Sequence, residues 1–127
     1  MQTPIKILIV EDEIIVAMEI EFALQSSGFN VVGKASNSQK ALELAEKFLP
    51  DVILMDINIK GNSNGIETAL DIFKFHKPAV IFVSAYSDKE TMDKLKKVQP
   101  HFYLSKPYTH SELKEKIAEA LSGITPA

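Results

Sequence analysis

Four short runs of mainly apolar residues each end beside a side chain that could take part in chemistry. The runs are residues 5–10, 51–55, 79–83 and 102–104, and the side chains that follow them are Glu11 with Asp12, Asp56, Ser84 and Lys106. Short apolar runs bounded by turn-forming residues are typical of buried strands. In an open parallel sheet the carboxyl ends of neighbouring strands meet at one edge, so we expect these polar groups to converge there.

Convergence of Glu11, Asp12 and Asp56 would crowd three carboxylates that repel one another, and a bound cation would relieve that repulsion. An all-oxygen set of ligands in a chain without cysteine favours a hard divalent ion, Mg²⁺ or Mn²⁺. Beside such an ion, Lys106 could hold an incoming phosphoryl group as a point charge, and Ser84 could donate a hydrogen bond to it. Asp56 is then the candidate nucleophile, because carboxylates form acyl phosphates.

Each of these residues also has an ordinary structural explanation when it is taken alone. An acidic pair after a strand more often caps the following helix, a lone lysine is more often solvated, and a serine is usually a turn former. The combination favours a functional site, because the candidate residues stand at or beside the ends of different expected strands.

Helical patterns alternate with the strand-like runs along the chain. Strands are expected at residues 5–10, 30–35, 51–55, 79–83 and 102–104, and helices at residues 13–27, from a cap within 36–38 to 48, at 65–76, at 87–99 and from 109 or 111 onward. The first, third and fourth strands are almost entirely apolar, as expected where helices cover both faces of a parallel sheet. With right-handed crossovers, the sequence predicts an α/β fold of the (βα)₅ type, a doubly wound, flavodoxin-like parallel sheet with strand order 2-1-3-4-5.

The chain has 127 residues, a net charge of −3 and no cysteine. These values predict one domain over residues 1–127, without a disulfide framework and without a general electrostatic basis for nucleic-acid binding. The sequence has neither the pattern of a signal peptide nor an apolar run of membrane-spanning length, so we expect a cytoplasmic protein. No helix-turn-helix or output segment follows the last helix, which predicts a stand-alone domain or one excised from a longer protein.

The chain resembles the receiver domain of two-component response regulators, a CheY-like domain, along nearly its whole length. Four segments carry the resemblance in order: Ile-Leu-Ile-Val-Glu-Asp at residues 7–12, Asp-Val-Ile-Leu-Met-Asp at 51–56, Val-Ser-Ala at 83–85 and Tyr-Leu-Ser-Lys-Pro at 103–107. The resemblance implies a phosphorelay switch in which Asp56 accepts a phosphoryl group from a sensor histidine kinase or a histidine phosphotransfer protein. It implies no enzymatic activity beyond catalysis of the domain's own phosphorylation and dephosphorylation.

The resemblance also implies roles for the other candidate residues. It implies a Mg²⁺ site whose ligands are Asp12, Asp56, the backbone carbonyl of Asn58 and, through water, Glu11. Ser84 and Lys106 would bind the phosphoryl oxygens, and Tyr103 would be the switch aromatic that turns inward when Ser84 moves toward the phosphate. The peptide bond between Lys106 and Pro107 is commonly cis in this family.

The sequence departs from the family pattern at three places. Glu11 stands where aspartate is more frequent, and Ser84 stands where threonine is more frequent. The loop after Asp56 has Lys60 in place of a frequent proline and is one residue longer before Gly65. We interpret this loop as a trait of a subfamily.

Relatives tune the lifetime of the acyl phosphate at two variable positions, which are Asn58 and Tyr86 in this chain. We hypothesise that Tyr86 shields the phosphoryl group from water and so prolongs the active state. Asn58 also bears on the main alternative, a Mg²⁺-dependent phosphohydrolase with an aspartyl-phosphate intermediate. Such enzymes need a second aspartate as a general acid two residues after the nucleophile, and asparagine cannot donate a proton in that way. An FMN-binding flavodoxin is a third option, but acids stand after the first strand in place of its Ser/Thr-rich loop.

Two surfaces are expected to contact partners. The helix over residues 13–27 has an apolar core face, and it has further apolar residues outside that face, namely Ile14, Ile15, Met18 and Phe22. In the family this helix meets the helix of the histidine-bearing partner, although part of the stripe could instead pack against the last helix. The surface formed by residues 87–99, the last strand and the last helix is expected to respond to phosphorylation and to bind a separate output protein or a second copy of the chain.

Overall fold

The computed structural model describes residues 4–59, 64–85, 89–98 and 101–124. Its parallel sheet has the strand order β2-β1-β3-β4-β5. The strands are β1 (Lys6–Val10), β2 (Asn30–Ala35), β3 (Val52–Asp56), β4 (Ala79–Ser84) and β5 (His101–Ser105). The helices are α1 (Ile14–Ser26), α2 (Ser38–Phe48), α3 (Gly65–Ile72), α4 (Lys89–Leu95) and α5 (His110–Ile124). The predicted (βα)₅ fold and its strand order are confirmed.

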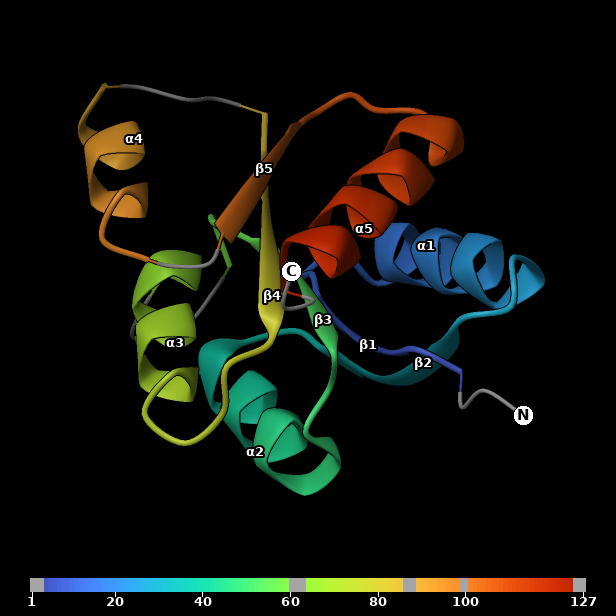
Figure 1. Cartoon of the computed structure of the whole chain (residues 1–127), viewed down its shortest axis with the longest axis horizontal. Coiled ribbons are helices and arrows are strands. Elements are labelled where there is room, and N and C mark those ends of the chain that lie inside the picture. Colours follow the sequence, from blue (N-terminus) through green and yellow to red (C-terminus); the bar gives the residue numbers. More distant parts are fainter. Residues whose placement is uncertain (1–3, 60–63, 86–88, 99–100, 125–127) are drawn as a thin grey trace.

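Helices cover both faces of the sheet, with α1 and α5 on one side and α2, α3 and α4 on the other (Figure 1). Successive strand residues point to opposite faces, so β1, β3 and β4 each contribute to two separate cores. Ile53 and Phe82 pack toward α2 and α3, whereas Leu54 and Ile81 pack toward α1 and α5. Burial on both faces explains why these strands are apolar except at their ends, at Lys6, Asp56 and Ser84. None of the helices in the described ranges is both long and apolar enough to span a membrane.

The helix ends follow local signals in the sequence. Gly28 has φ of +93°, a left-handed conformation that glycine adopts without strain, and it ends α1 as expected. Asn37 caps α2, because its side-chain oxygen accepts a hydrogen bond of 2.8 Å from the Lys40 backbone N–H. A capping box starts α5: Thr109 Oγ1 accepts from the Glu112 N–H, and Glu112 Oε1 accepts from the Thr109 N–H, both at 3.1 Å.

Two helices are shorter at their carboxyl ends than the sequence predicts. The helix expected to reach residue 76 ends at Ile72, and the helix expected to reach residue 99 ends at Leu95. After the first of these, the His76 ring nitrogen Nε2 lies 2.6 Å from the Pro50 carbonyl oxygen. After the second, the Val98 side chain is completely buried. Both segments leave the helical path to make tertiary contacts, which periodicity alone does not reveal.

The carboxyl end of α2 contains a strained residue. Leu49 has φ of 46° and ψ of 63°, and it is the one non-glycine residue with positive φ in the described ranges. A side chain in this left-handed region costs about 1–2 kcal/mol. Because the Leu49 side chain is 46% exposed, it recovers little of that cost by burial.

Leu49→Gly is therefore expected to raise the free energy of unfolding by about 0.5–1 kcal/mol, because glycine removes the strain. Urea denaturation measures the change. Lys47→Gly, two residues earlier in the same helix, is the control and should instead lower stability by about 1 kcal/mol. Equal destabilisation by both variants would show that the leucine is not strained.

Candidate functional site

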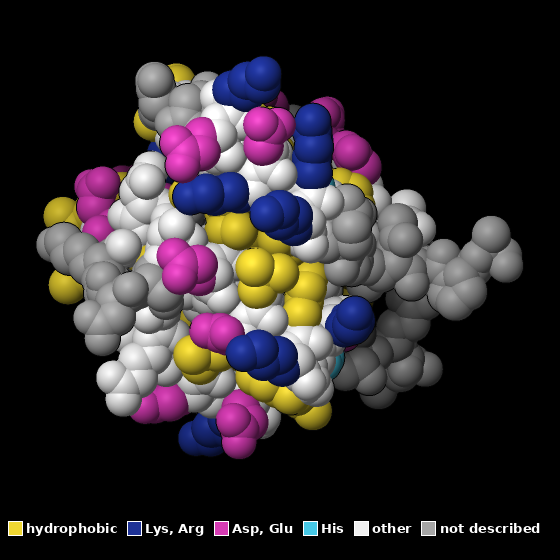
Figure 2. Space-filling model, turned by 90° about the vertical axis from the view of Figure 1, so that its left-hand side faces the viewer, with side chains coloured by type: hydrophobic (Ala, Val, Ile, Leu, Met, Phe, Trp, Pro, Cys, Tyr) yellow, Lys and Arg dark blue, Asp and Glu magenta, His cyan; other side chains and the backbone are white. Residues whose placement is uncertain are grey.

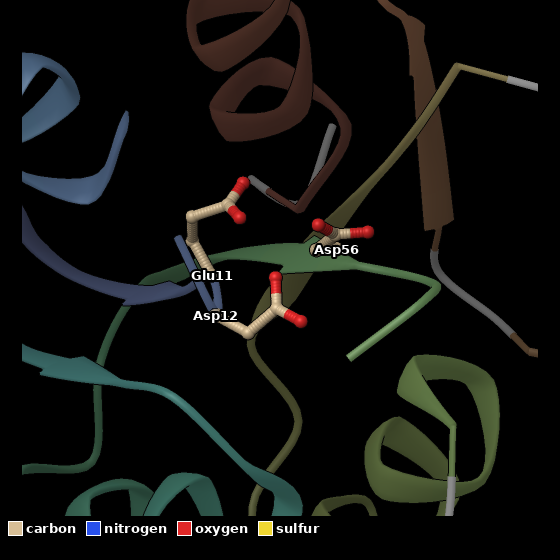
Figure 3. Close-up of side chains that lie close together, drawn as sticks. All are labelled: Glu11, Asp12 and Asp56. Carbon is tan, nitrogen blue, oxygen red and sulfur yellow. The ribbon is translucent and has the colours of Figure 1, made fainter. Parts of the chain in front are cut away.

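Three carboxylates converge at the carboxyl edge of the sheet. Glu11 and Asp12 follow β1, Asp56 is the last residue of β3, and these strands are hydrogen-bonded neighbours. Figure 3 shows the three side chains turned toward one another. Each offers a carboxylate oxygen, and these oxygens lie within 4.8 Å of one another. Glu11 and Asp56 are buried, whereas Asp12 is partly exposed.

Lys106 provides a positive charge within this cluster. Its Nζ lies 3.2 Å from Asp56 Oδ2 and 3.4 Å from Glu11 Oε1. The segment is held in place because the Lys106 backbone N–H donates to the Ser84 carbonyl oxygen at 2.9 Å. The bond between Lys106 and Pro107 is cis. Burial lowers the pKa of the Lys106 ammonium, but the charges of Asp56 and Glu11 outweigh burial and set its pKa above the ordinary value. Lys106 therefore stays protonated.

The cluster remains electrostatically costly despite this lysine. Burial raises the pKa of the Glu11 carboxyl above its usual value. The hydrogen bond from the Glu13 N–H to Glu11 Oε2 and the charge of Lys106 oppose this shift, while the charge of Asp56 adds to it. Three carboxylates thus face one ammonium group. Their oxygens form the kind of ligand set that suits a hard divalent cation, so the residues present fit Mg²⁺ or Mn²⁺.

Backbone hydrogen bonds fix the segment that carries Asp56. The Asn58 N–H donates to Asp56 Oδ1 at 2.9 Å, and the Ile57 N–H donates to the Val83 carbonyl at 3.1 Å. The Gly65 N–H then closes the loop by donating to the Ile57 carbonyl at 2.9 Å. The Asp56 carboxylate is therefore held by the backbone N–H of Asn58, and Asn58 itself is exposed.

Gly65 supports the site in a way that the sequence analysis did not predict. It starts α3 directly against the backbone of Asp56 and Ile57. A Cβ atom on Gly65 would lie 2.9 Å from Ile57 Cα and closer still to the Asp56 carbonyl oxygen. Both obstacles are backbone atoms, which cannot rotate away, so only glycine fits. The signal available in the sequence was a glycine at the first position of an expected helix.

Gly65→Ala is expected to lower the free energy of unfolding by about 1–3 kcal/mol, because α3 must move away from β3. Gly33→Ala is the matched control: its Cβ would meet the flexible end of Leu44 at 3.0 Å. That variant should stay within about 1 kcal/mol of the parent. Chemical denaturation of both variants makes the comparison, and an equal loss in the two would refute the backbone clash.

Ser84 and Tyr103 lie together beside the cluster. Ser84 is the last residue of β4 and is almost completely buried. Tyr103 comes from the neighbouring strand β5, and its hydroxyl group lies 3.4 Å from the Ser84 carbonyl oxygen. Its ring packs against the core on the side of α2 and α3. Ser84 and Tyr103, for which a coupled movement is expected from the family resemblance, are thus in contact. Tyr86, which is expected to shield the acyl phosphate, lies outside the described residues.

The first helix exposes the apolar stripe expected from its sequence. Its core face is buried at Ala17, Ile20 and Leu24. Outside that face the exposed fraction is 53–74% for the four residues of the apolar stripe, which are Ile14, Ile15, Met18 and Phe22. This exposure argues against the alternative in which the stripe packs on α5.

Tyr108 is a second residue near the site that the sequence analysis missed. It follows Pro107, and its ring packs among the side chains between the sheet, α1 and α5. Burial raises the pKa of its phenol above the ordinary value, with Lys106 opposing and Glu11 and Asp56 adding to the shift. Tyr108 therefore remains a neutral phenol beside the charged cluster.

Comparisons with known proteins agree with this geometry. The sequence model of the response regulator receiver domain matches residues 7–118. The transcriptional regulatory protein PdtaR of Mycobacterium tuberculosis is 31% identical over 94% of this chain and 58% of its own length. The phyllosphere-induced regulator PhyR of Methylorubrum extorquens is 32% identical over 91% of this chain and 43% of its own. The chain thus spans about half the length of these curated relatives.

Solved structures show the same likeness. The signal receiver domain of a modulated diguanylate cyclase from Desulfovibrio desulfuricans has a TM-score of 0.87 at 32% identity, covering 95% of this chain and 96% of that one. The response regulator domain of Thermotoga maritima CheB has a TM-score of 0.83 at 31% identity, covering 98% and 100%. Receiver domains are typically signalling domains without an enzymatic activity of their own, even where a longer relative is named a cyclic di-GMP phosphodiesterase. The carboxylate cluster, the adjoining lysine and these matches lead to one conclusion: the chain belongs to the receiver domains of two-component response regulators.

Proposed function

We propose that this receiver domain is a switch that is phosphorylated on Asp56. The observation that carries the proposal is the position of the Asp56 carboxylate, 3.2 Å from Lys106 Nζ within the three-carboxylate cluster. In the proposed reaction a carboxylate oxygen of Asp56 attacks the phosphorus of a phosphohistidine. The P–N bond breaks as the P–O bond forms, and the histidine ring leaves with the electron pair and takes up a proton. The donor is a sensor histidine kinase or a histidine phosphotransfer protein.

The proposed roles of the surrounding residues follow from their chemistry. Asp12, Asp56 and the backbone carbonyl of Asn58 would hold Mg²⁺, with Glu11 acting through water. When bound, the ion supplies positive charge against the negative charge of the phosphoryl group. Lys106 neutralises further charge on the phosphoryl oxygens, and the Ser84 hydroxyl donates a hydrogen bond to them.

Phosphorylation adds a charge of about −1.5 to −2 at Asp56, which would draw the Ser84 hydroxyl and the Lys106 ammonium toward it. Because the Tyr103 hydroxyl contacts the Ser84 carbonyl, movement of Ser84 would alter the contact that helps to hold the Tyr103 ring in its position. The element beside it is weakly anchored, since Leu95 is the one buried residue within α4. Such an element can shift at small cost in free energy.

The proposed output surface consists of α4, β5 and α5. Figure 2 shows the adjoining face, formed by α3 and α4, where lysine and acidic side chains together surround exposed hydrophobic ones. The lysines of α4 and of the turn after it are Lys89, Lys94, Lys96 and Lys97, and Met92 is exposed between them. A surface of this kind could bind a separate output protein or a second copy of the chain in the phosphorylated state.

Incubation with acetyl phosphate and Mg²⁺ tests the proposed function. A switch gains one phosphoryl group per chain, seen by mass spectrometry as a stoichiometric and transient modification. Sustained release of phosphate from a range of phosphate esters would instead favour the phosphohydrolase. Residue Asn58, two positions after Asp56, argues against that enzyme because an amide is not a general acid.

The apolar stripe on α1 is the proposed docking surface for the phosphodonor. Met18→Glu or Ile15→Glu is expected to slow phosphotransfer from the kinase by about tenfold, because a charge would be buried against the partner's helix. The thermal midpoint should stay near that of the parent, since both side chains are exposed. Phe75→Glu, at an exposed aromatic residue that follows α3, is the control and should transfer at the parental rate. Equal rates for the stripe variants and the parent would exclude docking at this stripe.

A further inference from the structure

Two cavities flank the amino-terminal half of α1. The α1–α2 cavity, of about 390 Å³, lies between α1 and the segment that leads from β2 into α2. The α1–α5 cavity, of about 460 Å³, lies between α1 and the segment that joins β5 to α5. Lys106 lines the α1–α5 cavity and Glu11 lines the α1–α2 cavity, so both adjoin the carboxylate cluster.

The α1–α5 cavity is suited to a long basic side chain. Glu13 and Glu19 line it, and within the described part of the chain neither carboxylate takes part in an ion pair. Its other titratable or charged lining groups are Tyr108, His110 and Lys106, and the lysine is already paired with the carboxylate cluster. The remaining lining residues are apolar or nearly so, namely Val16, Ile20, Ala85 and Pro107. Apolar walls suit the methylene stem of lysine or arginine, and the two carboxylates suit its charged end.

The α1–α2 cavity has the opposite charge. Lys34 and Lys40 line it, together with the polar residues Ser36 and Asn37. Among the described residues its one acidic lining residue is Glu11, which is buried and paired with Lys106. The two lysines have exposed partners outside the cavity, Glu21 at 2.8 Å and Glu43 at 3.8 Å. Exposed ion pairs of this kind contribute little free energy, so both ammonium groups can turn to a partner's carboxylate.

We infer that the phosphodonor lies across α1 in one orientation, with a basic side chain in the α1–α5 cavity and an acidic side chain in the α1–α2 cavity. The inference rests on the proposed function, because a donor that reaches Asp56 must cover the region where both cavities meet the cluster. Ile14 lines the α1–α2 cavity and the rest of the apolar stripe continues along α1, which provides hydrophobic contact beside the two charges. A donor turned end for end would place like charges together, which disfavours that orientation.

The test uses two double variants of the full chain in which the charges are reversed. One carries Glu13→Lys and Glu19→Lys, and the other carries Lys34→Glu and Lys40→Glu. The probes are the autophosphorylated catalytic fragments of the sensor histidine kinases of the same cell. For each variant the rate of transfer from a kinase is divided by its rate of modification by acetyl phosphate. For the kinase that phosphorylates the parent fastest, both variants are expected to lower this ratio by about tenfold, because the KM for the phosphorylated kinase rises. The dependence of the transfer rate on ionic strength should also change.

Glu46→Lys and Lys47→Glu, at exposed positions in the last turn of α2, are the controls and should stay within about twofold of the parent. Ratios near the parental value in either reversal variant would overturn the inferred orientation. So would a dimer in sedimentation that both reversals dissociate, because a second copy of the chain would then occupy the cavities. If neither acetyl phosphate nor any kinase labels the chain, the proposed function fails and this inference with it. Labelling with unchanged ratios overturns the inference alone.

Discussion

Asp56→Asn is expected to abolish phosphorylation of the chain by acetyl phosphate and by histidine kinases alike. The amide is not an effective nucleophile toward phosphorus, and an acyl phosphate cannot form on it without loss of ammonia. The amide oxygen can still accept the hydrogen bond from the Asn58 N–H that now reaches Asp56 Oδ1 at 2.9 Å. The local backbone is therefore preserved, and the loss can be attributed to the missing carboxylate.

The stability of Asp56→Asn should change by no more than about 1 kcal/mol, since two effects oppose each other. Lys106 loses one of its two carboxylate partners, but Glu11 and Asp12 lose a repelling neighbour. Asp51→Asn is the matched control on the opposite end of β3, where its Oδ2 accepts from the Lys6 N–H at 2.9 Å. Mass spectrometry after incubation with acetyl phosphate and Mg²⁺ should show full modification of this control. Modification of Asp56→Asn, or its loss in folded Asp51→Asn, would contradict the assignment of the acceptor.

The sheet could be predicted because its strands carry a strong and simple signal. Ile53 and Leu54 point to opposite faces, and both are buried because helices cover both faces. Such a run is apolar without interruption, and right-handed crossovers leave few orders in which parallel strands can be arranged. The helix ends could be predicted where a cap residue fixes them locally, as at Gly28 and Thr109.

Other features could not be predicted because they depend on contacts far apart in the sequence. Leu49 adopts a left-handed conformation that no local residue preference favours, and α4 ends where Val98 enters the core. The close approach of Gly65 to the Asp56 carbonyl joins the start of α3 to the end of β3 across a loop. The periodicity of apolar residues indicates which face of a helix or strand is buried, but it gives no information on contacts between backbone atoms of different elements.

In the candidate site, too, the features set by strand order could be predicted, whereas those set by the path of a connecting segment could not. Glu11, Asp12 and Asp56 were expected to converge because strand order alone brings the ends of β1 and β3 together, and the structure confirms that convergence. The contact between Lys106 and two of these carboxylates depends on the segment after β5, whose path the sequence does not determine. Tyr108 was missed for this reason, since its partly buried ring packs against the core between the sheet, α1 and α5 only because of the path of that segment.

Lys106→Met is expected to change Mg²⁺ affinity and phosphorylation in opposite directions. Removal of the ammonium leaves three carboxylates without a cation, so Mg²⁺ binding should strengthen by about tenfold, equivalent to about 1.4 kcal/mol. Modification by acetyl phosphate should nevertheless slow by about a hundredfold, because the phosphoryl oxygens lose their fixed positive charge. Isothermal calorimetry measures the first change and a mass-spectrometric time course measures the second.

Lys116→Met is the control, because Lys116 on α5 is 26% exposed and paired with Glu119 at 3.3 Å, while Lys106 is 27% exposed. The same loss of one lysine at similar burial should leave both Mg²⁺ affinity and phosphorylation near the parental values. If Lys106→Met weakened Mg²⁺ binding and phosphorylation together, the lysine would serve mainly to hold the carboxylates in place. Opposite changes would instead show that the charge of Lys106 has two separate effects. Before the reaction it competes with the metal ion for the carboxylates, and during the reaction it stabilises the incoming phosphoryl group.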